Sequence, residues 1–308
     1  MKKIYFLGLV VSVLGFTPLH AQDCAGTGCL PQEAQNQCTK NFREGCIDWA
    51  NGVFYAVGFG VPNTKFKSAA QRNYSAAVAA EQVAMRNLLR LIETTHLDSE
   101  TTVQDGMLES DRIRTKIKGK IRRVQMVGAP RYMSDGSVNV TMKMQMREVI
   151  KVLAEDPRIK AFSAPHEIQA PQALVSTSTA GSSTSTAGSS TSKASGVFTG
   201  LLIDARGTEI SPALSPKVLN EDGDVIYGFA DVDRQFSLEQ GMMGYLKDPQ
   251  AARSNERIKD RPFEIKALHS SGKNNADLVI SNADGVRLRQ MNREQSFLRE
   301  ARVMVVLD

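Results

Sequence analysis

The chain has 308 residues, 38 of them Lys or Arg and 33 Asp or Glu, which gives a formal net charge of +5. Its contents of 42% hydrophobic and 23% charged residues are ordinary for a globular protein, and exclude a wholly disordered chain. A chain of this length predicts two domains.

The first 21 residues have the pattern of a secretory signal peptide. Lys2 and Lys3 precede the apolar run 4–16, and a small-residue cleavage site follows at Ala21. The apolar run is too short to span a bilayer as a helix. Cys24 does not directly follow the cleavage site, so we expect no lipid attachment. We therefore predict cleavage after Ala21, a periplasmic location with association to the outer membrane or the flagellum left open, and no transmembrane segment in the mature chain.

All four cysteines lie in the short segment 22–51, as Cys24, Cys29, Cys38 and Cys46. An even number of cysteines in an exported chain predicts two disulfides, and three pairings remain open. The spacings do not match zinc-binding patterns, so we expect no metal here.

The next segment, 52–152, has the pattern of a first domain. An apolar strand is predicted over 52–60, and a long helix over 66–96, where alanines and leucines recur at helical spacing. Alanine-rich stretches favour the helix and allow close packing on a sheet. A shorter helical piece is predicted between residues 99 and 109.

A run of alternating basic residues then defines the candidate binding site. Ile113, Ile117 and Ile121 stand among the intervening odd positions, and the bases occupy every even position: Arg112, Arg114, Lys116, Lys118, Lys120 and Arg122. Strict alternation is typical of a half-buried strand. A helix also fits the isoleucine spacing, but it would spread the charges around the cylinder. We interpret the run as a strand that forms a hairpin with a second alternating strand, 138–146, across a turn at Asp135-Gly136.

These elements predict an α+β first domain, a small antiparallel sheet with a long helix. Residues 52–152 hold 16 bases and 9 acids, whereas residues 197–308 hold 15 bases and 17 acids. The net positive charge therefore belongs to the first domain.

Residues 153–196 have the composition of a flexible linker. The sequence STSTAGS occurs twice in tandem from residue 176, and a degraded third copy ends at Gly196. Such a Ser/Thr/Gly/Ala-rich stretch has almost nothing to bury. We expect it to tether the two domains without docking them rigidly.

Residues 197–308 predict a mixed α/β domain. Strands are expected over 197–203, 263–268, 277–280 and 302–307, and a hairpin pairs 217–219 with 225–227 across Asp222-Gly223. Asp248 before Pro249 predicts a helix start, with the helix running to residue 258. Ser281 with Asp284 resembles a capping box for a helix to residue 291.

No nucleotide-binding, hydrolase or metalloprotease motif occurs, and we expect neither a cofactor nor an enzymatic activity. The basic run is the best candidate for binding an anionic partner, although a solvated charged face explains it equally well. Nucleic acid is disfavoured for an exported chain. Asp204 and Arg206, at a strand end, are an alternative enzymatic site, although a local ion pair is the simpler interpretation.

The strand YAVGFG at 55–60, the alanine-rich helix and the stretch YMSDGSVNVTMKM resemble the LPP-twenty lipoprotein family. That family includes flagellar outer-membrane lipoprotein P and domains like the amino-terminal part of flagellar assembly protein T. The resemblance covers about 100 residues, rests on a pattern, and transfers no functional residue. It implies a non-enzymatic envelope protein, and the absence of a lipidation cysteine departs from the family.

The leading expectation is an exported assembly or scaffold protein of the cell envelope, associated in one version with flagellar outer rings and forming homo- or hetero-oligomers with envelope proteins. The alternatives are a module that binds an anionic envelope component, either lipopolysaccharide phosphate or peptidoglycan, and an enzyme centred on Asp204 and Arg206.

Overall fold

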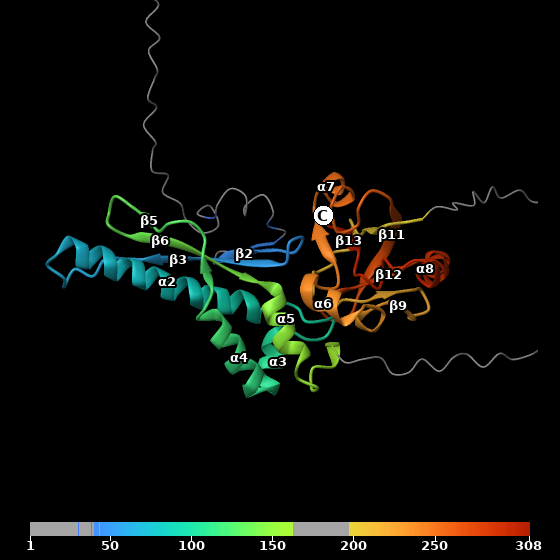
Figure 1. Cartoon of the computed structure of the whole chain (residues 1–308), viewed down its shortest axis with the longest axis horizontal. Helices are drawn as coiled ribbons and strands as arrows, with labels where there is room; N and C mark the ends of the chain where they lie inside the picture. The colour runs from blue at the N-terminus through green and yellow to red at the C-terminus, as the bar shows by residue number, and fades with distance from the viewer. Residues whose placement is uncertain (1–29, 31–37, 39, 43, 163–196) are drawn as a thin grey trace, which may run out of the picture.

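The computed structural model describes residues 30, 38, 40–42, 44–162 and 197–308. The predicted signal peptide, its cleavage site, Cys24, Cys29 and the repeats of the linker lie outside the described residues. The two predicted domains are present, an elongated first domain and a rounder second domain beside one of its ends (Figure 1). Among the described residues no helix is long and apolar enough to cross a membrane.

The first domain is built on a six-stranded antiparallel sheet, as predicted. The strands follow the spatial order β1, β2, β3, β6, β4, and β5 pairs with the far end of β6. Their bounds are β1 (Lys40–Phe42), β2 (Gly45–Asp48), β3 (Val53–Gly60), β4 (Gln125–Met126), β5 (Arg131–Tyr132) and β6 (Val138–Gln145). The cysteine segment thus contributes β1 and β2 to this sheet, and a disulfide joins Cys38 to Cys46.

The long helix α2 (Ala69–Glu93) covers one face of this sheet and runs almost the length of the domain (Figure 1). Its buried alanines Ala76, Ala80 and Ala84 pack against β3 and β6. The approach is close because β3 carries glycine there: a Cβ added at Gly58 would lie 2.0 Å from the carbonyl oxygen of Ala80. The alanine-rich helix therefore packs directly on the backbone of β3.

Three further helices complete the first domain: α3 (Val103–Glu109), α4 (Asp111–Ile121) and α5 (Met146–Ala154). Strand β6 confirms the predicted strand, with Val138, Val140, Met142 and Met144 in the core. The predicted polar face is not exposed throughout, because Asn139 and Thr141 are buried as well, and Met146 begins α5. Its partners are β3, β4 and β5. The predicted hairpin between β6 and the basic run is therefore wrong, because that run is the helix α4.

The second domain is a mixed α/β fold around a seven-stranded sheet, as predicted. The spatial order is β10-β13-β7-β11-β12-β8-β9. The strands are β7 (Gly200–Asp204), β8 (Val218–Leu219), β9 (Val225–Tyr227), β10 (Gly244–Leu246), β11 (Pro262–Ser271), β12 (Asp277–Ile280) and β13 (Val303–Val306). β13 is buried between β10 and β7 and runs parallel to both.

The helices of the second domain are α6 (Arg234–Gln240), α7 (Pro249–Arg253) and α8 (Asn282–Glu294), with a 3₁₀ turn, η3 (Phe229–Asp231). Both predicted helix starts are confirmed: the Asp248 carboxylate accepts from the Gln250 N–H at 2.8 Å, and the Ser281 hydroxyl accepts from the Asp284 N–H at 3.1 Å. The hairpin of β8 and β9 is confirmed as well. Helix α7 ends at Arg253, five residues before the predicted end.

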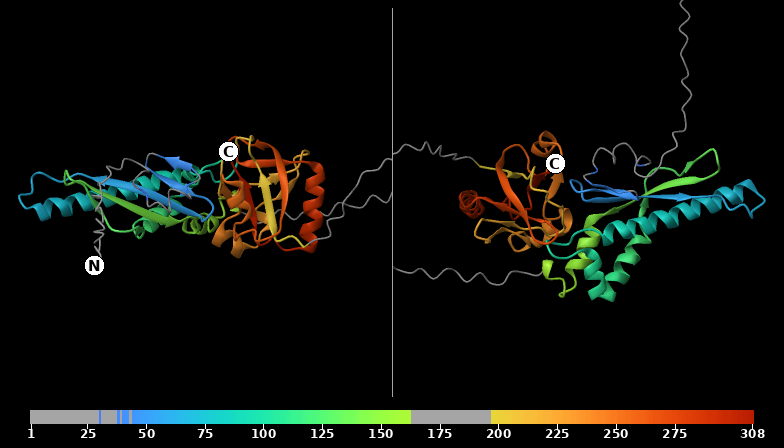
Figure 2. Two further views of the ribbon diagram at one scale, coloured as in Figure 1. Left: turned by 90° about the horizontal axis from the view of Figure 1, so that it is seen from above. Right: turned by 180° about the vertical axis from the view of Figure 1, so that it is seen from behind.

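The two domains are docked, which corrects the expectation of a loose tether. Trp49 of the first domain packs edge-on against Tyr245 of the second, with ring centroids 5.6 Å apart. The N–H groups of Leu214 and Ser215 donate to the carbonyls of His96 and Leu97, and one buried hydrophobic cluster includes residues of both domains. The domains therefore share a continuous core. Figure 2 shows the two docked domains from two further directions.

The first domain also extends beyond its predicted end at residue 152. The chain continues through the end of α5 into a 3₁₀ turn, η2 (Lys160–Phe162), where Ile159 and Phe162 are buried. The Phe162 ring packs edge-on against Phe229 of the second domain, with centroids 5.2 Å apart. The first ten residues assigned to the linker are thus part of the docked structure.

Candidate interaction surface

Helix α4 carries the predicted anion-binding residues, and its sequence explains why it is a helix. Ser110 caps its first turn, accepting a hydrogen bond from the Ile113 N–H at 3.3 Å. Ile113, Ile117 and Ile121, four residues apart, are all buried against the core. Thr115 and Gly119 occupy the remaining odd positions and are exposed. In a strand, these two residues would lie on the buried face together with the isoleucines. In the helix they are exposed, and the buried face holds only the three isoleucines.

Alternation at every second residue has a simple consequence on a helix. With about 100° between successive residues, the six bases fall into two rows on either side of the buried isoleucines. We call Arg112, Lys116 and Lys120 the inner stripe, and Arg114, Lys118 and Arg122 the outer stripe. Within each stripe the residues are four apart and therefore neighbours along the helix surface.

The inner stripe faces one acid on α5 and one directly after its last residue. Lys116 pairs with Glu155, and Lys120 pairs with Glu148. The hydrogen bond from Lys120 lowers the pKa of Glu148, and that from Lys116 lowers the pKa of Glu155, with further help from the charge of Arg112. These side chains are partly exposed, so each pair stabilises the fold by only about 0–1 kcal/mol.

The outer stripe has much less neutralisation. Arg114 contacts Asp111 at 3.2 Å, but that carboxylate is 94% exposed. Among the described residues, the structure gives Lys118 and Arg122 no ion-pair partner. Residues 111–123 and 146–155 together hold nine bases and three acids. The outer stripe carries part of the surplus positive charge of this region, and Arg112, Arg123, Arg147 and Lys151 carry the rest.

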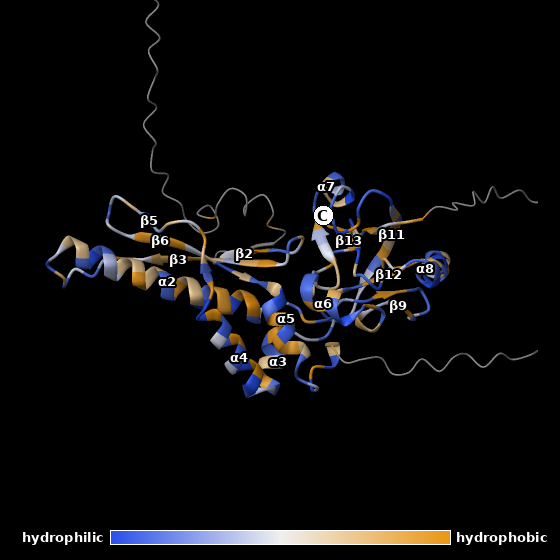
Figure 3. Cartoon of the chain, in the orientation of Figure 1, coloured by the Kyte–Doolittle hydropathy of each residue, from blue (hydrophilic) through white to orange (hydrophobic). Residues whose placement is uncertain are grey.

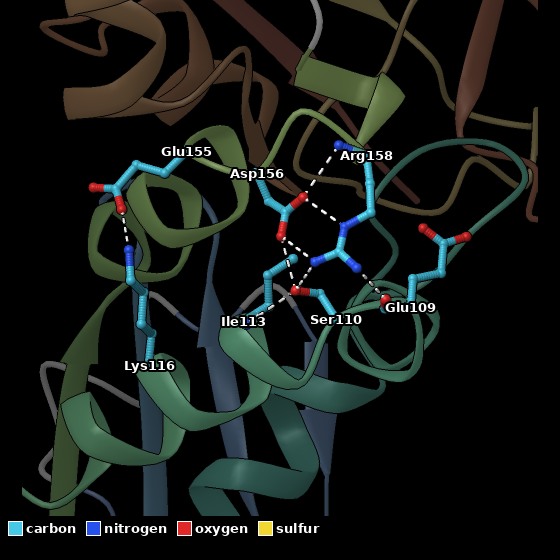
Figure 4. A network of polar contacts seen from close by, with 7 residues as sticks. All are labelled: Glu109, Ser110, Ile113, Lys116, Glu155, Asp156 and Arg158. Carbon is cyan, nitrogen blue, oxygen red and sulfur yellow. Dashed lines mark hydrogen bonds and ion pairs between the residues drawn. The ribbon is translucent and has the colours of Figure 1, made fainter.

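A polar network fixes the N-terminus of α4 to the corner after α5 (Figure 4). The carboxylate of buried Asp156 accepts two hydrogen bonds from the Arg158 guanidinium, at 2.9 and 2.7 Å, one from the Arg158 N–H at 3.1 Å and one from the Ser110 hydroxyl at 2.8 Å. Arg158 also donates to the Glu109 carbonyl at 2.8 Å. Arg158 and Ser110 hold the pKa of Asp156 far below its usual range. The helix that carries the stripes is thus held rigidly on the domain.

The sequence pattern does not predict this network, because Asp156 and Arg158 lie in the stretch 153–196 that has the composition of a linker. Ser110 was the one available signal: a serine directly before a run with isoleucines four residues apart is typical of a helix N-cap. The six predicted site residues lie together at α4, but they divide into two rows with different surroundings and do not share the single face that a strand would give them.

A cavity of about 380 Å³ lies where the domains meet, lined from both sides. Arg147 and Arg257 contribute positive charge to it, and Glu239 and Glu256 contribute negative charge. The Arg257 guanidinium donates to the carbonyls of Gln240, Gly241 and Ala301, and burial lowers its pKa to about 10. Arg257 therefore stays charged and ties down the end of α6. The mixed charge of the lining does not select a ligand class.

Asp204 and Arg206, the alternative enzymatic site, form the local ion pair that the simpler interpretation predicts. Arg206 donates to both carboxylate oxygens of Asp204, at 2.8 and 2.6 Å, and this lowers the pKa of Asp204. Asp308, at the end of the chain, accepts from the Gly207 N–H at 3.0 Å. Within the described ranges no cluster of His, Cys, Asp and Glu could hold a metal ion.

Residues 200–308 match the family described as Treponema pallidum Tp0624, second domain. The match spans the whole seven-stranded sheet, about a third of the chain, and places the start of the second domain at β7. It does not extend to the first domain, which carries both stripes. The search of curated proteins found no match to the chain.

Proposed function

We propose that the protein is an exported, non-enzymatic assembly or scaffold component of the cell envelope, and that it binds an acidic surface of a partner protein through the outer stripe of α4. The observation that carries the proposal is the contrast between the two stripes. Two of the three inner-stripe bases, Lys116 and Lys120, pair with acids of the same chain, whereas in the outer stripe only Arg114 has an ion pair, and Lys118 and Arg122 have none among the described residues.

The geometry of α4 supports a binding role. Like charges four residues apart on a helix repel, so a row of three bases in which only Arg114 has an ion pair lowers the stability of the isolated protein. An acidic partner would remove that repulsion and would be attracted over a distance of about 10 Å at moderate ionic strength. The anchoring of Ser110 by Asp156 and Arg158 keeps the stripe in place before binding, which reduces the entropy lost on association.

Two further observations support the placement in the envelope. The disulfide between Cys38 and Cys46 is compatible with an exported protein, because disulfides persist in oxidising compartments. The resemblance of residues 50–150 to the LPP-twenty family supports an assembly role, and makes the outer rings of the flagellum the first place to look for the partner.

Two arginines in the outer stripe also favour a second candidate, an anionic envelope component such as lipopolysaccharide phosphate or peptidoglycan, since guanidinium groups bind phosphate and carboxylate groups in a bidentate manner. This alternative uses the same side chains and differs only in the ligand. An enzymatic role at Asp204 is less well supported, because Arg206 occupies both carboxylate oxygens.

The test is affinity purification of the mature protein from its own envelope, with two matched triple variants. The outer-stripe variant carries Arg114→Gln, Lys118→Gln and Arg122→Gln, and the inner-stripe variant carries Arg112→Gln, Lys116→Gln and Lys120→Gln. Both remove three charges from the same helix. We expect a partner protein to co-purify with the parent and the inner-stripe variant, but not with the outer-stripe variant. Equal recovery with both variants would reject the proposal, and recovery of glycan or lipopolysaccharide without protein would favour the second candidate.

A further inference from the structure

The end of the first domain farthest from the second domain has an unusual surface. The loop between β3 and α2, the first turns of α2, and the β5–β6 turn meet there (Figures 1 and 2). A Cβ added at Gly136 would lie 3.5 Å from Pro62, and the Asn63 N–H donates to the Ser75 hydroxyl at 3.4 Å. We call this end, residues 59–78 with 131–137, the distal tip.

Large apolar side chains are exposed all over the distal tip. Tyr74 is 73% exposed, Val61 is 64% exposed and Tyr132 is 55% exposed. The full set is Phe59, Val61, Phe66, Tyr74, Val78 and Tyr132. Single exposed apolar residues are normal, but six of them at one end of a domain favour an interaction surface. Figure 3 shows hydrophobic and hydrophilic residues intermixed in the loop that ends the domain.

The loop that carries Phe66 is held in a defined shape. Asn63 closes it, since its carbonyl accepts from the Phe66 N–H at 3.2 Å and its side chain accepts from the Lys65 N–H at 3.0 Å. Arg72 then pins the loop to α2 by donating to the carbonyls of Phe66 and Lys67, at 3.0 and 2.8 Å. The aromatic side chain is therefore presented to solvent by a fixed backbone.

The distal tip has a surplus of positive charge. Its bases are Lys65, Lys67, Arg72 and Arg131, and its acid is Asp135, which accepts hydrogen bonds from the N–H and the hydroxyl of Ser137. Arg72 donates to carbonyls, which do not neutralise it. The first turn of α2 contains no acid, so the positive end of a 25-residue helix is not offset locally. Aromatic and basic side chains are thus combined on one convex end.

We propose that the distal tip contacts the surface of an anionic phospholipid bilayer. Aromatic rings, with their apolar body, and Tyr hydroxyls suit the boundary between headgroups and acyl chains. Lysine and arginine beside them are attracted to anionic headgroups and contribute about fivefold in affinity each. A second copy of the chain fits less well, because tip-to-tip contact would bring like charges together. This membrane contact is separate from the outer stripe on α4.

Binding of the full mature chain to vesicles tests the proposal. Vesicles of phosphatidylcholine with phosphatidylglycerol should sediment with the protein, and vesicles of phosphatidylcholine alone should not. Lys65→Gln with Lys67→Gln should weaken binding by about 25-fold. Phe66→Ser with Tyr74→Ser should weaken it by about tenfold or more, because two apolar anchors are lost. Val225→Ser with Leu268→Ser removes two similarly exposed apolar residues from the second domain and should change nothing.

A fluorescent probe locates the contact. The chain has one tryptophan, Trp49, and it is buried, so its emission should not respond to vesicles. Phe66→Trp should shift its emission to shorter wavelength when phosphatidylglycerol vesicles are added, and Val225→Trp should not. All substituted residues are exposed, and an unchanged melting temperature confirms that each variant folds.

Three results would overturn the proposal: no sedimentation with phosphatidylglycerol vesicles, sedimentation that the tip variants leave unchanged, or an emission shift at Val225→Trp equal to that at Phe66→Trp. A parent chain that self-associates without binding vesicles, and that Phe66→Ser with Tyr74→Ser makes monomeric, would identify the distal tip as a contact between copies. The outer-stripe variant should keep its vesicle binding, which separates this proposal from the proposed function.

Discussion

Gly119 provides a direct test of the helical structure of the basic run. It lies inside α4, is exposed, and a Cβ added there would meet nothing within 4 Å. Its φ is not in the left-handed region. Gly119→Ala should therefore stabilise the protein by about 0.8–1.0 kcal/mol, the difference in helix propensity, because no contact opposes it. For a chain of this size that corresponds to a rise in melting temperature of about 2–4 °C.

A second substitution at the same position distinguishes a helix from a strand by the sign of the difference in stability between two variants. Valine is less favourable than alanine in a helix, because its branched side chain loses rotamer freedom, whereas strands favour valine. In urea denaturation followed by circular dichroism, Gly119→Ala should be more stable than Gly119→Val by about 0.5 kcal/mol. If Gly119→Val were the more stable variant, the run would behave as a strand, and the assignment of inner and outer stripes would be incorrect.

Four other outcomes follow from the structure. Proteolysis within residues 176–196 should leave two fragments that co-elute on gel filtration, and separate elution would contradict the docked interface. Gly58→Ala should destabilise the protein by about 1–3 kcal/mol or more in urea denaturation, because its Cβ would lie 2.0 Å from the Ala80 carbonyl. Replacing Cys38 and Cys46 by serine should lower the free energy of unfolding by about 2–3 kcal/mol in the chain-entropy model, and an unchanged midpoint would show that the disulfide does not form. The pKa of Asp156 is lowered in the folded state, so the stability that its charged form contributes is present above pH about 4 and is lost as the pH falls. The Asp156→Asn variant should therefore lose less stability than the parent between pH 5 and pH 2. An identical dependence of stability on pH in parent and variant would contradict the network.

The elements that were predicted correctly are those whose sequence pattern fits only one type of secondary structure. The apolar alternation of β6 and the small residues of α2 each fit a single periodicity, and Asp248 with Pro249 has the form of a helix start. The basic run fits two periodicities, because bases two residues apart satisfy a strand while Ile113, Ile117 and Ile121 satisfy a helix. Thr115 and Gly119 carried the distinguishing information. They are not apolar, so the odd positions form a helical stripe and not a complete strand face.

The docking of the domains could not be predicted from the linker. A flexible chain of that composition permits both docked and separate domains, since its length sets only the reach. The decisive side chains are Trp49 and Phe162, which lie near the ends of the first domain and find their aromatic partners Tyr245 and Phe229 more than sixty residues away along the chain. Such long-range pairs leave no local pattern in the sequence. The separation of the two stripes was hidden for the same reason, because Glu148 and Glu155 belong to another helix.

The central claim is that the outer stripe binds an acidic partner while the inner stripe serves the fold. Once the partner is identified, its dissociation constant should be measured with the parent, the outer-stripe variant and the inner-stripe variant at low and at moderate salt. We predict that the outer-stripe variant binds much more weakly and loses most of the salt dependence, while the inner-stripe variant keeps both the affinity and the salt dependence of the parent. Equal affinities and equal salt dependence for the two variants would contradict the claim.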